Sequence, residues 1–141
     1  MQYPVRYTKE PAGWLAEILG AGGGGLATQG DSLAECKAMA QDAVTEVLIA
    51  QFELGQDFSP VPECPDGWEW VLPRQSAWAS LQIRIARKNC GMTEAAAAVA
   101  CGVAAPTYIR WEDYYKSNAT IKTLEKVALA LGLKLEVRLA A

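Results

Sequence analysis

Alternating apolar and polar residues predict a β-hairpin at the start of the chain. In QYPVRYT, Tyr3, Val5 and Tyr7 recur at every second position, which is the period of a half-buried strand. Pro4 cannot donate a ladder hydrogen bond, so we expect it on an edge strand or at the start of a strand. The turn EPAG then leads into WLAEIL, a second predicted strand with the same alternation.

Helical spacing begins after a glycine-rich corner. LATQG predicts a short third strand, and Ser32 with Glu35 forms a capping box at the start of a helix. The loop GQDFSPVPECPDG follows this helix and leads into WEWVLP, a predicted last strand. The apolar stripe that we expect on the helix consists of Cys36, Met39, Ala40, Ala43, Val47 and Ala50.

The glycine run has the G-x-G-x-x-G spacing of a phosphate-binding loop at Gly20, Gly22 and Gly25. A dinucleotide-binding loop needs its third glycine to open a helix, with an acidic residue about twenty positions later at the end of a strand. Here LATQGDS separates the glycines from the helix, and Asp42 falls inside that helix. We therefore interpret the glycines as a corner between two strands that tolerates positive φ.

The second half of the chain has the pattern of a helical domain. In SAWASLQIRIARKNC, an amphipathic helix is indicated by Trp78, Leu81 and Ile85. Its cations are interpreted as a solvated face, although helix ends can also hold phosphates. These cations are Arg84, Arg87 and Lys88.

Two shorter helices are predicted after this one. Thr93 can cap a helix over residues 94–100, Gly102 supplies a tight turn, and Pro106 suits the first turn of the next helix. Helix, glycine turn and helix together form an αα unit.

The segment LKLEVRL alternates apolar and charged residues and predicts a short strand. No other strand is predicted in this half of the chain, and an unpaired apolar edge invites pairing. We therefore expect this strand to pair with its copy from a second chain, in a homodimer or a tetramer. The dimerising residues would be Leu133, Leu135, Val137 and Leu139.

The composition is typical of a folded protein and limits its chemistry. Of the 141 residues, 51% are hydrophobic, enough for one ordinary domain or two small ones. No apolar run of about 18 residues and no signal-peptide pattern occurs, so we expect a cytoplasmic protein that does not enter a membrane. The four cysteines form no C-x-x-C pair and histidine is absent, so we expect no metal site and no cofactor.

Charge divides the chain after Pro73. Residues 1–73 carry 3 Lys and Arg against 11 Asp and Glu, a net charge of −8, whereas residues 74–141 carry 10 against 5, a net charge of +5. We expect two domains with these bounds, one binding a basic partner and the other an anionic partner. The alternative is a polarity that affects only solubility.

The motifs YPVRYT, GWLAEI and TQGDSLAE, followed by an Ala-rich helix, resemble the HicB antitoxin family over roughly residues 2–72. The resemblance implies a partial, catalytically inactive RNase H-like β-β-β-α-β fold that binds a small basic mRNA-cleaving HicA-type toxin. Four acidic residues near the last strand could contact such a toxin, although a solvated rim would explain them equally well. They are Asp57, Glu63, Asp66 and Glu69.

Residues 78–137 resemble the Cro/repressor-type helix-turn-helix, with Ala98 at the helix crossing, Gly102 and Val103 at the turn, and Tyr108 inside the second helix. The resemblance implies operator DNA as a partner. The residues expected to face the bases are Ala105, Thr107 and Arg110, and those expected near the DNA backbone are Lys116, Ser117 and Asn118.

These patterns together predict an α+β protein in which an RNase H-like module precedes an all-α DNA-binding domain that ends in a dimerising strand. The function that they indicate is that of an antitoxin which masks its toxin and represses its own operon. A helix-turn-helix regulator with a ligand-sensing first half is the alternative. An active RNase H-type enzyme would need clustered carboxylates, and the strands offer essentially Glu17 alone, so we expect no catalytic activity.

Overall fold

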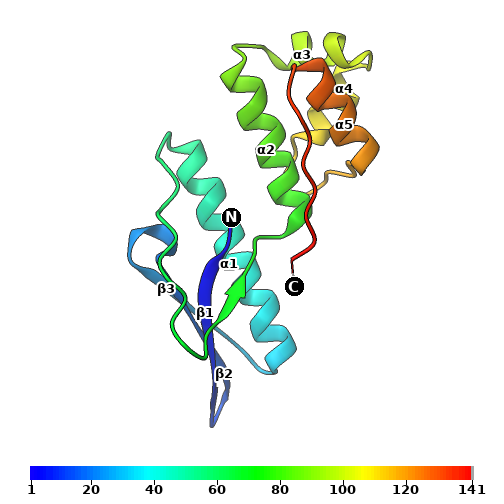
Figure 1. Cartoon of the computed structure of the whole chain (residues 1–141). Coiled ribbons are helices and arrows are strands. Elements are labelled where there is room, and N and C mark those ends of the chain that lie inside the picture. The colour runs from blue at the N-terminus through cyan, green and yellow to red at the C-terminus, as the bar shows by residue number, and fades with distance from the viewer. Residues whose placement is uncertain (141) are drawn as a thin grey trace. The chain divides into compact units, whose positions relative to one another are not determined.

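The contrast between the two halves of the sequence corresponds to two structural units, each described by itself. The computed structural model describes residues 1–140 and divides the chain into Met1–Arg74 and the residues from Gln75 onward. The first unit contains a sheet and one long helix, and the described part of the second contains four helices (Figure 1).

The first unit has the predicted β-β-β-α-β order. Its strands follow the spatial order β3-β2-β1-β4, and every neighbouring pair is antiparallel. Pro4 is the second residue of β1, which lies between β2 and β4, so it is near a strand start but not on an edge. The elements are β1 (Tyr3–Glu10), β2 (Gly13–Leu19), the 3-10 turn η1 (Ala21–Gly23), β3 (Gly25–Gly30), α1 (Leu33–Glu53) and β4 (Glu69–Val71).

α1 covers one face of this sheet (Figure 1) and begins at the predicted cap. The Ser32 hydroxyl accepts a hydrogen bond from the amide of Glu35 at 3.1 Å. The predicted apolar stripe is wrong in part, because Met39 and Ala50 are exposed. The buried residues of α1 are Cys36, Ala40, Val44, Thr45, Leu48, Ile49 and Gln51. Alanine occurs at both buried and exposed positions of this helix. The pattern of apolar residues in the sequence therefore did not distinguish the buried side of α1 from its neighbouring side.

The glycine run forms the corner that the sequence predicts. Gly25 opens β3 and not a helix, so the chain lacks the strand-to-helix junction that a dinucleotide-binding loop requires. Gly20 has a φ of +80°, and a Cβ atom there would lie 2.6 Å from Cδ of Pro62. Only glycine fits this position without displacing the loop that leads to β4.

The second unit has helix boundaries set by local signals. Thr93 caps α3 by accepting a hydrogen bond from the amide of Ala96 at 3.1 Å, and Gly102 ends α3 with a φ of +68°. Pro106 lies in the first turn of α4, as predicted. The helices are α2 (Gln75–Asn89), α3 (Glu94–Cys101), α4 (Ala105–Trp111) and α5 (Ile121–Ala130). Their shared core comprises Ile83, Ala97, Ala98, Cys101, Tyr108, Trp111 and Val127.

A buried ion pair joins α2 to the residue after α4. Nε of Arg87 lies 2.6 Å from Oε1 of Glu112 and its Nη2 lies 3.0 Å from Oε2, while the Glu112 side chain is only 1% exposed. The Tyr108 hydroxyl donates to the same carboxylate at 2.9 Å. Hydrogen bonding to Glu112 raises the pKa of Arg87 despite the opposing effect of burial.

The interpretation of the α2 cations as a solvated face is therefore wrong for two of them. Arg87 is buried against Glu112. Arg84 donates to the backbone carbonyl of Glu112 at 3.2 Å and lies 4.5 Å from the ring centroid of Tyr114. Lys88 is exposed, as expected.

The predicted C-terminal strand is absent from the single chain. Residues 133–140 form neither helix nor strand. A strand needs a neighbour for its backbone hydrogen bonds, and the described part of this unit contains no other strand. The segment LKLEVRL therefore has the alternation of a strand but no partner strand in the described part of this unit.

Glu112→Gln is expected to destabilise the second unit by about 3 kcal/mol, because it leaves the buried Arg87 cation without a counter-charge. Native-state amide exchange over residues 94–111 measures this loss. The matched control is Glu94→Gln, since Glu94 is partly exposed and its carboxylate lies 3.8 Å from Arg87. The control should lose less than about 1 kcal/mol. Equal losses in the two variants would contradict a dominant role for Glu112.

Candidate nucleic-acid interface

The packing of α4 determines which of its side chains face outward. Tyr108 and Trp111 are buried, with ring centroids 5.9 Å apart in an edge-on arrangement. Both belong to the core shared by the helices of the second unit. Because these two side chains lie on one side of a short helix, they fix its rotation. The opposite side of α4 is left in solvent, and in a helix pair of this kind it is the side that enters the major groove.

The three α4 residues predicted to face the bases are all exposed: Ala105, Thr107 and Arg110. Arg110 has a guanidinium that can contact a guanine edge or a phosphate, and Thr107 has one hydroxyl. Ala105 has neither a donor nor an acceptor in its side chain. The outer side of α4 is therefore poor in hydrogen-bonding groups.

Asp113 organises the turn that follows α4. Its Oδ1 accepts hydrogen bonds from the amides of Tyr115 at 2.9 Å and Lys116 at 3.0 Å. The hydrogen bond from the Tyr115 amide holds the pKa of Asp113 below its usual range, and the charges of Lys116 and Arg110 add to this effect. The Asp113 carboxylate thus lies near two cations that are candidates for DNA contact.

The residues predicted near the DNA backbone fall into two kinds. Lys116 and Asn118 are exposed. Ser117 is only partly exposed, and its hydroxyl accepts a hydrogen bond from the amide of Ala119 at 3.2 Å. Ser117 thus helps to shape the turn before α5.

Two further cations lie on α5, Lys122 and Lys126, and both are exposed. Burial raises the pKa of the Cys101 thiol at the end of α3, and the charge of Lys126 opposes this rise. Sequence reasoning missed these lysines as candidate phosphate contacts. The signal that could have found them is their spacing of four residues, which places both on one side of α5.

The acidic candidates of the first unit lie along one loop and the strand that follows it. Asp57, Glu63 and Asp66 are exposed in the segment between α1 and β4. Glu69 opens β4, and its carboxylate lies 3.2 Å from Nζ of Lys37. The Lys37 ammonium therefore partly compensates the charge of Glu69, whereas the carboxylates of the loop residues are open to solvent.

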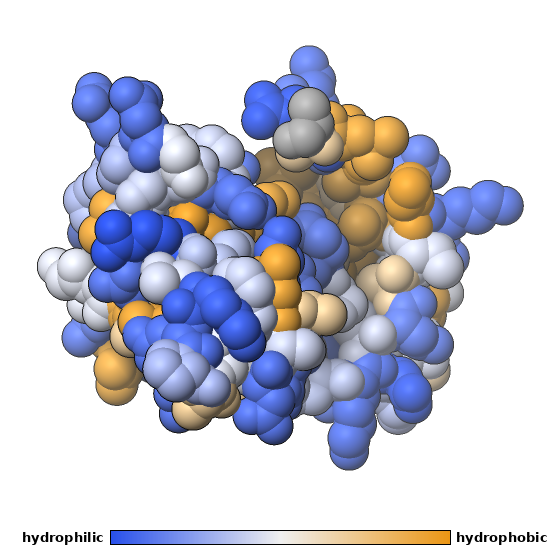
Figure 2. All heavy atoms as spheres, turned by 90° about the horizontal axis from the view of Figure 1, so that it is seen from below, coloured by the Kyte–Doolittle hydropathy of each residue, from blue (hydrophilic) through white to orange (hydrophobic). Residues whose placement is uncertain are grey.

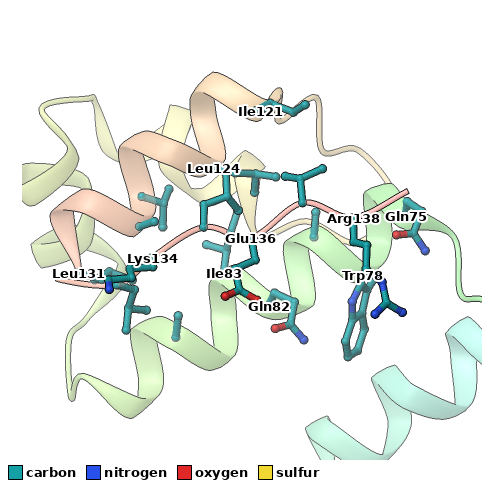
Figure 3. Close-up of a pocket in the computed structure, with 17 residues that line it drawn as sticks. Gln75, Trp78, Gln82, Ile83, Ile121, Leu124, Leu131, Lys134, Glu136 and Arg138 are labelled. Atoms are coloured by element: carbon teal, nitrogen blue, oxygen red, sulfur yellow. The ribbon is translucent and has the colours of Figure 1, made fainter. Parts of the chain in front are cut away.

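The C-terminal segment runs along a groove between α2 and α5. Figure 3 shows it crossing between the two helices, with Glu136 and Arg138 turned toward the α2 side. The groove has a volume of about 550 Å³ and is lined on the α2 side by Trp78, Gln82 and Ile83. The apolar residues Leu133, Leu135 and Val137 also lie against a second hollow on the outer side of α5.

Hydrophobic side chains are exposed along α5 and the C-terminal segment. Val137 is 59% exposed and Leu139 is 95% exposed, whereas Leu135 is half-buried. Figure 2 shows hydrophobic residues, in orange, gathered at the upper right of the view. We define the C-terminal apolar patch as the exposed large hydrophobic residues of α5 and the C-terminal segment, which are Ile121, Leu129, Leu133, Val137 and Leu139.

Two further features of residues 1–140 concern metal binding and membranes. Nowhere in this range do three or more His, Cys, Asp or Glu side chains lie together where they could hold a metal ion. None of the helices in the same range has the length and apolar character needed to cross a membrane.

Comparison with known families identifies the second unit. Residues 83–137 match the family model described as Helix-turn-helix, which spans the end of α2, all of α3 to α5 and the start of the C-terminal segment. No curated protein matches the chain. The chain therefore contains a helix-turn-helix domain, and the match supports a DNA-binding transcription regulator.

Arg110→Gln is expected to weaken binding of the full chain to duplex DNA by about tenfold at low salt, because it removes a charged donor from the outer side of α4. The matched control is Lys9→Gln, which removes the same charge from an exposed position of β1 in the first unit. Fluorescence anisotropy with a labelled duplex over a range of salt concentrations measures both variants. If they weaken binding equally, α4 is not the element that contacts DNA.

Proposed function

We propose that the chain is a HicAB-type antitoxin that acts by binding alone. In this proposal, the first unit masks a small basic mRNA-cleaving toxin, and the second unit represses the operon that encodes both proteins. The observation that carries the proposal is the joining of an acidic β-β-β-α-β unit to a basic helix-turn-helix unit in one chain.

The antitoxin resemblance of the first unit is supported by its order of elements and by its charge. The motif TQGDSLAE spans the end of β3 and the capped start of α1, where the resemblance places a helix start. A net charge of −8 over residues 1–73 favours a cationic partner. Steric cover and charge complementarity are sufficient to inhibit a toxin, so the antitoxin needs no catalytic residue.

A ligand-sensing first half receives less support. A recess of about 300 Å³ at the end of the β1–β2 hairpin is lined by polar and charged residues, among them Glu10, Gln29 and Glu35. Small-molecule pockets are mostly apolar, with only a few polar groups. The first unit is therefore better suited to bind a protein than to enclose an apolar ligand.

Repression requires two copies of the helix-turn-helix on one operator, since such motifs commonly read half-sites as dimers. The C-terminal apolar patch is the surface that we assign to the dimer. Its segment 133–139 is not part of any strand among the described residues and carries apolar side chains at alternate positions, so two copies can pair as an antiparallel ribbon.

Glu63→Gln combined with Asp66→Asn is expected to weaken toxin binding and to reduce growth rescue, because two exposed loop carboxylates are lost. The probe is the product of the small reading frame adjacent to this gene, co-expressed with the full chain. The matched control is Glu10→Gln with Asp31→Asn, which removes the same charges at the β1–β2 hairpin and before α1. Rescue that fails even with the wild-type chain would overturn the antitoxin proposal.

Val137→Asp is expected to convert the dimer into a monomer, because it places a charge in the C-terminal apolar patch. Sedimentation equilibrium of the full chain measures the change. Val99→Asp is the matched control, since Val99 is exposed on α3 and lies outside this patch. A dimer that survives Val137→Asp unchanged would show that other residues form the interface.

A further inference from the structure

The outer side of α4 and the adjacent part of α3 have an unusual chemical character for a DNA-reading surface. Val99 is 80% exposed and Ile109 is 47% exposed, although both lie on the helices of the helix-turn-helix. Only Thr107 and Arg110 carry polar side-chain atoms among the exposed residues of the turn and α4. These exposed residues are Ala104, Ala105, Pro106, Thr107, Ile109 and Arg110.

The edges of the bases in the major groove decide what such a surface can distinguish. All four bases present hydrogen-bonding atoms there, and thymine alone also presents a C5-methyl group. A surface with few donors and acceptors gains little from the hydrogen-bonding atoms. Apolar side chains, by contrast, can pack against a methyl group and exclude water from it.

The charges around this apolar surface favour DNA as its occupant over a protein. Arg110 lies on α4, Lys116 in the turn that follows it and Lys126 on α5, and all three are exposed. Exposed cations around an apolar centre fit a duplex, since phosphates can occupy the rim while base edges occupy the middle.

We propose that the second unit reads its operator mainly through thymine methyl groups. Ala105, Ile109 and the Thr107 methyl pack against them, and Arg110 supplies the charged contact. This inference rests on the proposed DNA-binding function and specifies the sequence class that the site accepts. Such a surface selects major-groove sites rich in thymine and, apart from the contact of Arg110, distinguishes little between pairs that differ only in their hydrogen-bonding pattern.

The first test replaces thymine with deoxyuridine, which removes the methyl group and leaves the hydrogen-bonding pattern intact. The full chain is used to select duplexes from a random-sequence pool, and the preferred duplex is then synthesised with deoxyuridine at one thymine at a time. Binding should weaken by about fourfold for each contacted methyl that is removed. Unchanged affinity at every position would overturn the methyl readout while leaving DNA binding in place.

The second test uses a matched pair of substitutions at an exposed position. Thr107→Val keeps the methyl group and removes the hydroxyl, whereas Thr107→Ser keeps the hydroxyl and removes the methyl group. We expect Thr107→Val to retain the preference for thymine over deoxyuridine and Thr107→Ser to reduce it. The reverse result would overturn the proposal, because the hydroxyl would then be the reading group. If the wild-type chain binds no duplex from the pool even at low salt, the proposal of DNA binding itself is overturned.

Discussion

The second unit depends on the buried pair of Arg87 and Glu112. Removing a guanidinium and a carboxylate from water is unfavourable, so these groups are stable in the core only when each has its partner. The pair ties α2 to the end of α4, and the Tyr108 hydroxyl adds a hydrogen bond to the same carboxylate. Together these contacts fix the rotation of α4 and hence the identity of its outward side chains. The outward surface of α4, which we propose to face DNA, is thus a consequence of a core interaction.

Local signals in the sequence predicted the helix boundaries well, but contacts between distant residues were not predicted. The caps at Ser32 and Thr93 and the turn at Gly102 depend on neighbours within a few residues. Arg87 and its partner Glu112 are 25 residues apart, so periodicity alone cannot reveal the pair. A cation in an amphipathic helix is most often solvated. That general expectation failed for Arg87 because the buried carboxylate of Glu112 lies within hydrogen-bonding distance of it.

The C-terminal segment shows a second limit of prediction from sequence. Alternation in residues 133–139 predicts which side chains would share a face in a strand, but it does not supply a neighbouring strand. Backbone hydrogen bonds between strands are a property of a pair, and here the partner would belong to another chain. In the single chain, the segment instead lines the groove between α2 and α5. The site candidates Thr107 and Arg110 were easier to identify, because their exposure follows from the position of Tyr108 and Trp111 within one short helix.

The specificity that we propose for the outer side of α4 depends on dimerisation through the C-terminal apolar patch. A single copy that contacts two or three methyl groups, each contributing about fourfold, distinguishes its site by only about sixteen- to sixtyfold. Two copies held on one palindromic site multiply their separate discriminations, which raises this figure to several hundred or a few thousand. A surface with few polar contacts therefore depends on dimerisation more strongly than one with many. The few polar groups on α4 thus give a physical reason for the dimerisation that we propose for the C-terminal segment of the same unit.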